Sequence, residues 1–360
     1  MKDEAMPPAP AIKGRGSAER PAGRFEPLRY EPLPPDPGLL EDDLPPLPTR
    51  YVQDQARTLL VTNDSPDVGF EVGLNPYRGC EHGCIYCYAR PTHEYVGLSA
   101  GLDFESVIFV KQQAPALLRA ELAAPRYVPR PIGMSGVTDC YQPIERHLRL
   151  TRGCLEVLAE CRHPVGIVTK SALVVRDIDL LQELHRHGCV RIHVSLTTLD
   201  PELARKLEPR AAQPARRLQA IARLAAAGLP VSVLTAPIIP GLTEEELPAL
   251  LRAAADAGAQ GAGYIVLRLP HGVGELFEAW LARHYPGRQE RVLARVRQVR
   301  GGVLNDSRFG SRMKGEGLFA ELIANLFATA RRRAGLEREL PPLTTSAFRR
   351  PADPRQPTLF

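Results

Sequence analysis

Cys80, Cys84 and Cys87 have the spacing C-x3-C-x2-C in a short segment that also contains glycine. Such a loop can turn three thiolates toward one centre, and three soft ligands suit an iron–sulfur cluster or zinc. A structural zinc site requires four ligands, and His82 is available as the fourth. A four-iron cluster held by three thiolates instead leaves one iron open to a substrate or cofactor.

The other cysteines show no comparable spacing. The total of 7 is odd, and the crowding of three of them disfavours a disulfide framework. The remaining four cysteines lie in strand or helix patterns and are interpreted as small buried apolar side chains. These four are Cys140, Cys154, Cys161 and Cys189.

Composition places the chain among ordinary globular proteins, with 360 residues, 44% hydrophobic residues and a net charge of +5. No stretch approaches the ~20 apolar residues of a membrane-spanning helix. The first residues lack the apolar region of a secretory signal, so we expect a cytoplasmic protein without a membrane partner.

Residues 1–50 contain 12 of the 35 prolines. Proline lacks a backbone donor and fixes φ, so this stretch cannot form a helix or a central strand. We therefore predict that residues 1–55 are an extended, largely disordered arm. The alternative is a strap that docks over the following domain.

Residues 56–270 alternate short β-branched runs with amphipathic patterns. The predicted strands are Gly69–Leu74, Ile132–Thr138, Gly166–Thr169, Arg191–Leu196, Val231–Ala236 and Gly263–Leu267. The predicted helices are Ala114–Ala123, Arg152–Cys161, Ile178–His187, Ala215–Ala227 and Glu244–Ala257, with Asp177 as an N-cap and Gly188, Gly228 and Gly258 as C-terminal stops. The alternation predicts an α/β fold, an incomplete (β/α)6 TIM-type barrel with ligands at the carboxyl ends of its strands.

Residues 271–345 carry mainly helical patterns and many arginines. Residues 283–350 contain fifteen Lys and Arg against six Asp and Glu, a net charge of +9. A polyanion such as nucleic acid would meet this field, and the alternative is a set of solvated helix faces. We predict a basic helical region at 271–345 and a flexible tail at 346–360.

The order C-x3-C-x-Tyr-C after the first strand of an incomplete barrel resembles the radical S-adenosylmethionine (SAM) superfamily over about Ala56–Pro270. Within it, the chain is most similar to the branch of spore photoproduct lyase and DNA repair photolyase-like proteins. The segments that carry this likeness are CYAR at 87–90, TDCYQPIE at 138–145, TKS at 169–171, EP at 208–209 and APIIPGLT at 236–243.

This resemblance implies that Cys80, Cys84 and Cys87 ligate a [4Fe–4S] cluster and that SAM chelates the open iron. It further implies that an electron, supplied by a donor protein or reductant, breaks the sulfonium bond. The 5′-deoxyadenosyl radical so formed would remove a hydrogen atom from the substrate, while the protein supplies binding and orientation.

The same resemblance implies SAM-binding roles for five residues. Tyr86 would stand beside the cluster, and Thr138 and Asp139 would accept from the methionine ammonium. Lys170 would meet the methionine carboxylate, and Ser195 the ribose hydroxyls. The alternatives are a turn pair, an exposed strand-end lysine and a local strand-to-turn hydroxyl.

Cys140 is a candidate catalytic residue that departs from the family pattern. Spore photoproduct lyase uses a cysteine near the second strand as a hydrogen donor, but here Ser135 and Gly136 occupy the earlier position. We therefore keep only the hypothesis that Cys140 donates a hydrogen atom or thiol to another substrate. Glu208 and Arg217 could form an ion pair beside the SAM pocket, and we leave both out of the predicted site.

The chain ends in Gln356-Pro-Thr-Leu359-Phe360, which resembles the short peptide that docks on the bacterial DNA sliding clamp. A flexible tether with two apolar anchors and one amide suits a groove. The alternative is a terminus without function.

Three functions remain open from the sequence. The first is a lyase-like radical SAM enzyme that acts on nucleic acid, as in DNA repair. The second is a radical SAM enzyme that acts on RNA, a peptide or a small molecule. The third is a non-enzymatic, metal-bearing clamp adaptor.

Overall fold

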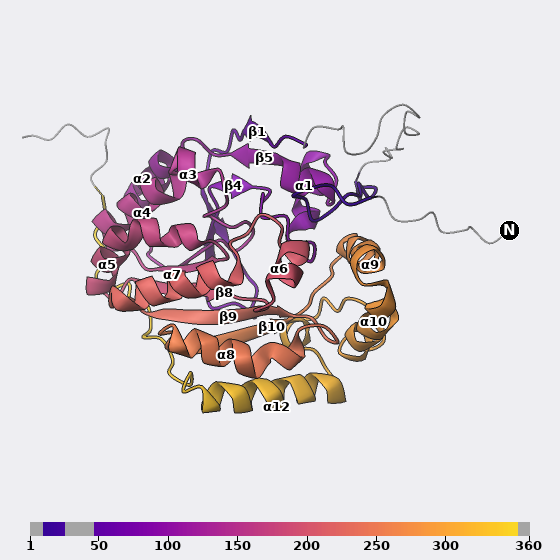
Figure 1. The fold of residues 1–360 in the computed structure, drawn as a ribbon. Coiled ribbons are helices and arrows are strands. Elements are labelled where there is room, and N and C mark those ends of the chain that lie inside the picture. The colour runs from indigo at the N-terminus through magenta and orange to yellow at the C-terminus, as the bar shows by residue number, and fades with distance from the viewer. Residues whose placement is uncertain (1–9, 26–46, 352–360) are drawn as a thin grey trace, which may run out of the picture.

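The computed structural model describes residues 10–25 and 47–351, which form an open α/β barrel (Figure 1). Its main sheet has seven strands in the order β10-β9-β8-β7-β6-β3-β2. β2 pairs antiparallel with β3, and the other neighbouring strands run parallel. The strands are β2 (Leu60–Thr62), β3 (Val72–Leu74), β6 (Ile132–Met134), β7 (Val165–Thr169), β8 (Val190–Ser195), β9 (Val231–Ile238) and β10 (Gly261–Val266). The predicted incomplete barrel of parallel strands is confirmed.

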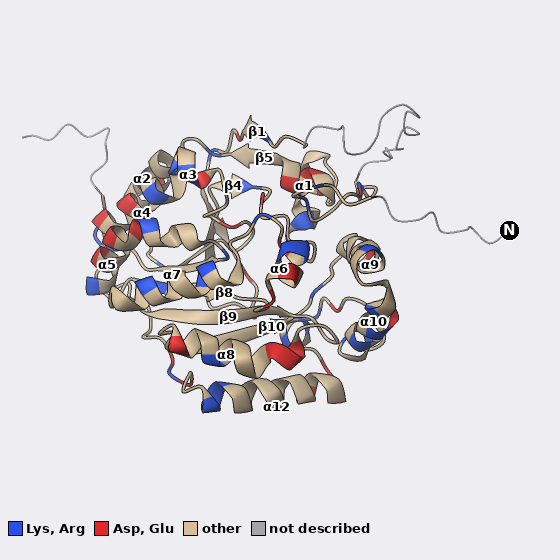
Figure 2. Cartoon of the chain, in the orientation of Figure 1, with Lys and Arg blue, Asp and Glu red and all other residues tan. Residues whose placement is uncertain are grey.

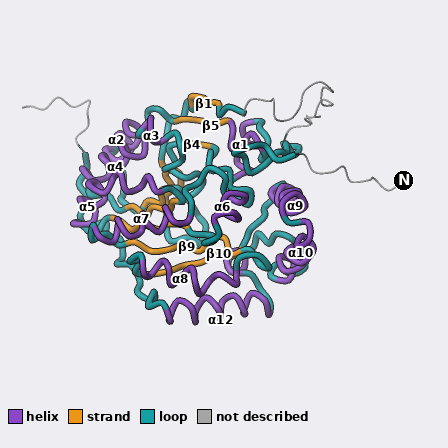
Figure 3. Tube along the Cα trace, viewed as in Figure 1, coloured by secondary structure: helices purple, strands orange, loops and turns teal. Residues whose placement is uncertain are grey.

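Helices follow the strands and cover the outside of the sheet (Figure 3). The covering helices are α2 (Ala114–Ala123), α4 (Leu150–Cys161), α5 (Ile178–Arg186), α7 (Pro214–Ala226) and α8 (Leu247–Asp256). Shorter turns are α3 (Glu145–Leu148), α6 (Pro201–Leu207), η3 (Ala172–Asp177) and η4 (Glu244–Glu246). Gly188, Gly228 and Gly258 follow three of these helices with positive φ, as the sequence predicts for glycine stops.

A second, smaller sheet differs from the prediction that residues 1–55 are a disordered arm. β1 (Arg50–Gln53) pairs in parallel with β5 (Val107–Val110), which also pairs with β4 (Tyr77–Arg78). α1 (Leu102–Ser106) and η2 (Arg90–Val96) lie beside this sheet. Residues 50–53 gain a partner far away in the sequence, which composition alone does not reveal.

Residues 10–25 also contact the domain. The Glu105 carboxylate is fully buried and accepts from the backbone N–H of Gly16 at 2.8 Å and of Ser17 at 2.9 Å. A Cβ at Gly16 would lie 1.8 Å from the carbonyl oxygen of Gly83, so this close approach requires glycine. The described part of the arm therefore packs against the loop that carries the cysteines, between Cys80 and Cys84.

The C-terminal region is helical. Its elements are α9 (Val273–His284), η5 (Pro286–Arg288), α10 (Gln289–Gln298), α11 (Ser311–Lys314) and α12 (Leu318–Arg333). α12 packs against α8. In the described ranges, no helix combines the length and apolar character that crossing a bilayer demands.

The predicted flexible tail begins too early at residue 346. Phe348 packs against the rings of His163 and Tyr127, and the N–H of Arg349 donates to the Cys161 carbonyl at 2.8 Å. These contacts join residues 346–351 to the domain. Gln356, Leu359 and Phe360 lie outside the described residues.

The basic residues of the C-terminal region are distributed over several elements. Lys and Arg lie on α10 and at the end of α12, on opposite sides of the view (Figure 2). Several of them pair with carboxylates, as Arg332 does with Glu337 and Arg297 with Glu278. The positive charge of this region is therefore spread over several elements and is partly neutralised by carboxylates.

Three histidines, His93 and His163 fully buried and His193 half-buried, predict a pH dependence of stability. Burial lowers the pKa of His93, His163 and His193 from 6.5 to about 4. The unfolded chain therefore binds more protons below pH 6.5, and stability falls as the pH drops from about 6.5 to about 4. By linkage we expect a loss of about 2 kcal/mol per histidine between roughly pH 7.5 and 5, measured by urea unfolding.

H163Q removes one of these groups and should shrink that pH-dependent loss by about 2 kcal/mol, whatever its effect at neutral pH. The matched control is H185Q, because His185 is exposed. If the free energy of unfolding depended on pH in the same way in H163Q and the unmodified protein, the lowered pKa of His163 would be contradicted.

Candidate active site

The three cysteines lie on one loop between β4 and η2, and the thiols of Cys84 and Cys87 are close enough to act electrostatically on that of Cys80. Cys80 and Cys84 are buried, and Cys87 is half-buried. Burial raises the pKa of the Cys80 thiol well above its usual value, and the nearby charges of Asp139, Cys84 and Cys87 raise it further. Burial likewise raises the pKa of Cys84 and of Cys87. A cation between these sulfurs would offset that penalty.

Backbone amides already favour the thiolate form. The N–H of Asp139 donates to the Cys80 sulfur, and the N–H groups of Ala89 and Arg90 donate to the Cys87 sulfur, which lowers the pKa of both thiols. Hydrogen bonds to sulfur are a feature of iron–sulfur sites. A soft, buried donor set with amides at its sulfurs fits a [4Fe–4S] cluster.

The zinc alternative has no support from the geometry. His82, its expected fourth ligand, turns its Nδ1 toward the Asp139 carboxylate at 3.4 Å. Within the part of the chain that the structure describes, no three His, Cys, Asp or Glu side chains, those of the three cysteines included, are already placed to hold one metal ion.

A buried ion pair holds the cysteine loop in place. The Arg90 guanidinium lies 3.0 Å from the Glu105 carboxylate, and both side chains are fully buried. Arg90 also donates from Nε to the Cys84 carbonyl at 2.9 Å and from Nη2 to the Gly83 carbonyl at 3.2 Å. Gly83 has a φ of 65°, and a Cβ there would lie 2.3 Å from a Glu105 oxygen. Arg90 therefore shapes the loop, a role the sequence did not suggest.

Thr138 and Asp139 lie just beyond β6, beside Cys80. The Thr138 hydroxyl donates to the Tyr77 carbonyl at 2.9 Å. The Asp139 carboxylate accepts from the Thr169 hydroxyl at 2.8 Å and from the Lys170 N–H at 2.7 Å. Asp139 therefore ties the ends of neighbouring strands β6 and β7, and an ammonium would share its oxygens with these donors.

Tyr86 and Lys170 meet at a buried carboxylate that the predicted site did not include. The Tyr86 hydroxyl donates to Glu208, and the Thr197 hydroxyl donates to the same oxygen at 2.7 Å. The Lys170 Nζ lies 3.9 Å from that oxygen and 5.8 Å from the centre of the Tyr86 ring. Arg217 forms an ion pair with the second oxygen of Glu208.

The environment of Glu208 keeps it ionised. Burial raises its pKa, but the charges of Arg217 and Lys170 and the hydrogen bonds from Arg217 and Tyr86 together lower it to about 2. The charges of Glu208, Lys170 and Arg217 also act on the Cys84 thiol: Glu208 raises its pKa, in addition to burial, and the two cations lower it. The signal in the sequence was the EP pair at 208–209 together with Arg217.

Ser195 and Cys140 have different surroundings. Ser195 is buried at the end of β8, and its carbonyl accepts from Arg217 at 3.1 Å, which places it beside the Glu208 group. Cys140 is fully buried in the main hydrophobic cluster, and burial raises the pKa of its thiol well above the usual value. The structure does not bring Cys140 to an open surface where it could meet a substrate.

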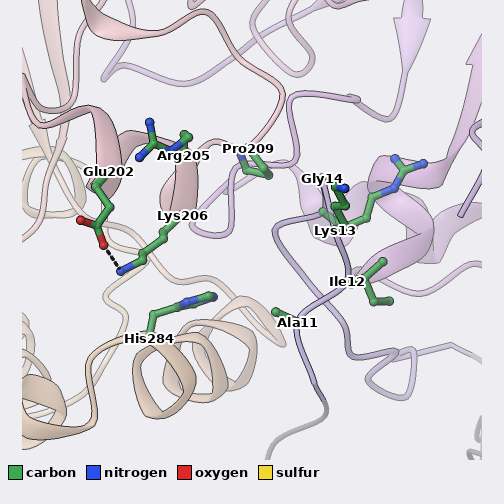
Figure 4. Close-up of a pocket in the computed structure, with 10 residues that line it drawn as sticks. Ala11, Ile12, Lys13, Gly14, Glu202, Arg205, Lys206, Pro209 and His284 are labelled. Carbon is green, nitrogen blue, oxygen red and sulfur yellow. Dashed lines mark hydrogen bonds and ion pairs between the residues drawn. The ribbon is translucent and has the colours of Figure 1, made fainter. Parts of the chain in front are cut away.

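An open cavity of about 280 Å³ lies between residues 11–15, α6 and α9 (Figure 4). Lys13, Lys206 and His284 line it, and Lys206 pairs with Glu202 at 2.7 Å. None of the three clustered cysteines lines this cavity, so it is separate from the cysteine site.

Glu208→Gln keeps the shape of the side chain but removes the charge that faces Arg217. We expect E208Q to lower the free energy of unfolding by about 3 kcal/mol, because a buried guanidinium loses its counter-charge. T197V removes one hydrogen bond from the same carboxylate and should cost about 1 kcal/mol. Urea unfolding measures both, and equal losses would rule out the charge pair as the main interaction.

Comparison with known proteins agrees with this geometry. The family model "Radical SAM superfamily" matches residues 74–254. Uncharacterised proteins of Mycobacterium bovis and Mycobacterium tuberculosis are each 37% identical over 295 residues, which covers 81% of this chain and 82% of theirs. An uncharacterised protein of Methanocaldococcus jannaschii is 30% identical over 178 residues, 49% of this chain and 64% of its own.

One solved structure shows a shared fold. A spore photoproduct lyase variant aligns with a TM-score of 0.55 and 16% identity over 79% of each chain. Another spore photoproduct lyase structure aligns over 66% of each chain with a TM-score of 0.48. The family match spans β3 to α8, the part that contains the cysteine loop and the Glu208 group. The chain belongs to the radical SAM superfamily, whose enzymes use a [4Fe–4S] cluster and S-adenosylmethionine.

Proposed function

We propose that this radical SAM enzyme acts on nucleic acid in a repair-like reaction. The observation that carries the chemistry is the position of three cysteines, two buried and one half-buried, on one loop next to the carboxyl ends of parallel strands, with backbone amides at two of the sulfurs. When bound, the cluster and SAM supply an organic radical that can remove a hydrogen atom from a substrate. The chain's own residues bind and orient these groups and exclude water.

In this proposal Cys80, Cys84 and Cys87 hold the cluster. The Asp139 N–H fixes the Cys80 sulfur, and the Asp139 carboxylate and Thr138 hydroxyl offer acceptors to the methionine ammonium. Because the Asp139 carboxylate also accepts from Thr169 and from the Lys170 N–H, its orientation is fixed before SAM binds.

Lys170 and Tyr86 form the other side of the cofactor site. Lys170 offers its ammonium to the methionine carboxylate, and Glu208 keeps that ammonium beside the Tyr86 ring. Ser195 offers a hydroxyl to the ribose from the neighbouring strand end. Glu208 acts through Lys170 and Tyr86 and is a positioning residue.

The nucleic-acid substrate is supported by the likeness of the motifs to the spore photoproduct lyase branch. It is also supported by Arg268, whose Nε lacks a hydrogen-bond partner among the described residues and whose guanidinium lies 5.2 Å from the ring of Tyr88, next to Cys87. RNA, a peptide or a small molecule is the second candidate class. Membership in an enzyme superfamily disfavours the third hypothesis, a non-enzymatic adaptor.

Docking on a bacterial sliding clamp through Gln356, Leu359 and Phe360 stays a separate proposal, since these residues lie outside the described ranges. Cys140 as a hydrogen donor also stays a hypothesis, and its complete burial counts against it.

Anaerobic reconstitution tests the metal site. The protein should bind about four irons per chain, as a single cubane cluster requires. C84A should lose most of this iron, because two thiolates remain, whereas C189A should retain it, because Cys189 lies outside the loop and bonds to the Arg162 carbonyl. Zinc instead of iron, or an unchanged iron content in C84A, would contradict the assignment.

Coupled turnover tests the substrate class. Reconstituted protein with dithionite and SAM should release 5′-deoxyadenosine, and ultraviolet-irradiated DNA should increase the release several-fold, on the order of tenfold, because bound substrate consumes the radical. C84A is the inactive control. Turnover that DNA does not change, but that RNA or peptides stimulate, would overturn the DNA proposal and leave the radical chemistry intact.

A further inference from the structure

Arg268 is a partly buried guanidinium that forms no ion pair with any residue in ranges 10–25 and 47–351. β10 ends at Val266, so Arg268 stands at the carboxyl end of the last strand of the barrel. Its Nε is buried and has no hydrogen-bond partner, and its Nη1 contacts only the sulfur of Met313, at 3.7 Å, among the described residues. A buried donor without an acceptor is costly, so such a group points to a ligand that supplies one.

Asp67 is the carboxylate whose charge acts on Arg268, but both of its oxygens bond to other groups. Asp67 accepts from the Arg312 Nε at 2.5 Å with one oxygen and from the Gly310 N–H at 2.7 Å with the other. These contacts join the β2–β3 loop, beside one edge of the main sheet, to Gly310 and α11, across the open side of the barrel. They leave Arg268 without a direct counter-charge.

Further guanidinium groups make the local field positive. Arg300 is buried and donates to the carbonyls of Val266 at 2.9 Å and Leu267 at 2.6 Å. The charge of Arg268 lowers the pKa of Arg300, and the charge of Arg312 lowers that of Arg268, both in addition to burial. Two carboxylates act on these three cations, and each already pairs with another arginine: Asp67 with Arg312, and Asp306, which acts on Arg300, with Arg308. This leaves Arg268 as the cation that favours an added anion.

The site lies next to the cysteine loop. The Arg268 guanidinium carbon is 5.2 Å from the centre of the Tyr88 ring, and Tyr88 directly follows Cys87. The ring is 47% exposed, and its hydroxyl donates to the Gly136 carbonyl, which fixes its position. An anion on Arg268 would therefore be held at the rim of the site where the chemistry is proposed to occur.

We propose that Arg268 binds a backbone phosphate of the nucleic-acid substrate at the open side of the barrel. This inference rests on the proposed function and adds to it the residue that holds the strand. A planar guanidinium with free donors matches phosphate geometry. The competing source of the same chemistry is the carboxylate of SAM, and the experiment separates the two.

The test measures binding of a fluorescein-labelled oligothymidylate of about 12 nucleotides by anisotropy, between about 50 and 200 mM NaCl. Reconstituted holoenzyme is compared with R268Q, R268K and R223Q. Arg223 is an exposed residue of α7, so R223Q controls for the loss of one positive charge. SAM affinity is measured on the same proteins by equilibrium dialysis.

We expect R268Q to bind the oligonucleotide about tenfold more weakly and to reduce the salt slope by about one phosphate contact. R268K should restore the dependence of affinity on salt but not the full affinity, because lysine keeps the positive charge and lacks the paired donors of the planar guanidinium. R223Q should match the unmodified protein, and SAM affinity should stay within about twofold in all four proteins, well below the effect of one charged hydrogen bond.

Oligonucleotide affinity and slope unchanged in R268Q would overturn the assignment while the proposed function stands. A loss of SAM affinity with normal oligonucleotide binding would assign Arg268 to the SAM carboxylate instead. If the unmodified holoenzyme itself fails to bind nucleic acid at low salt, the proposed substrate class and this assignment both fail.

Discussion

The structure depends on keeping three sulfur atoms together in a buried place. Burial disfavours the thiolate form that a metal requires, as the raised pKa values of the Cys80, Cys84 and Cys87 thiols show. Amide donors offset part of this cost, and the cluster of the family would offset the rest. The loop must therefore be rigid before it binds metal. Arg90 and Glu105 provide that rigidity, because each is buried and bonds to the other and to backbone on both sides.

A second buried group links the loop to the barrel. Glu208 draws Tyr86, Thr197 and Arg217 together from different parts of the chain, and Lys170 completes the group from the end of β7. Buried charges of this kind are costly unless all of them are paired, so the arrangement favours one geometry over looser ones. The result is a fixed pair of cation and aromatic ring beside Cys84.

The sequence predicted the parts whose signals are local. The cysteine spacing, the strand and helix alternation and the glycine stops after α5, α7 and α8 depend on neighbouring residues, and the structure contains them. Other parts depend on distant partners. Asp177 stands where an N-cap was predicted, but its carboxylate pairs with Arg152 and Arg176 instead of capping the helix.

The position of residues 10–25 also depends on a distant partner, because the Gly16 N–H donates to Glu105, 89 residues away in the sequence. Proline content shows that a segment is neither helix nor central strand, and it says nothing of docking. Arg268 was noticed only as a residue near a strand end. Only the structure shows that Asp67, the carboxylate whose charge acts on Arg268, pairs with Arg312 and leaves Arg268 without an ion pair among the described residues.

The central claim is that the three sulfurs hold a cluster with one iron open to SAM. Electron paramagnetic resonance of the dithionite-reduced, reconstituted protein tests this most directly, with spectra recorded before and after SAM is added. The account predicts a reduced cluster signal whose g values shift on addition of SAM, since the ligand set of one iron changes. A cluster signal that SAM leaves unchanged, or a protein that gives no cluster signal at all, would contradict it.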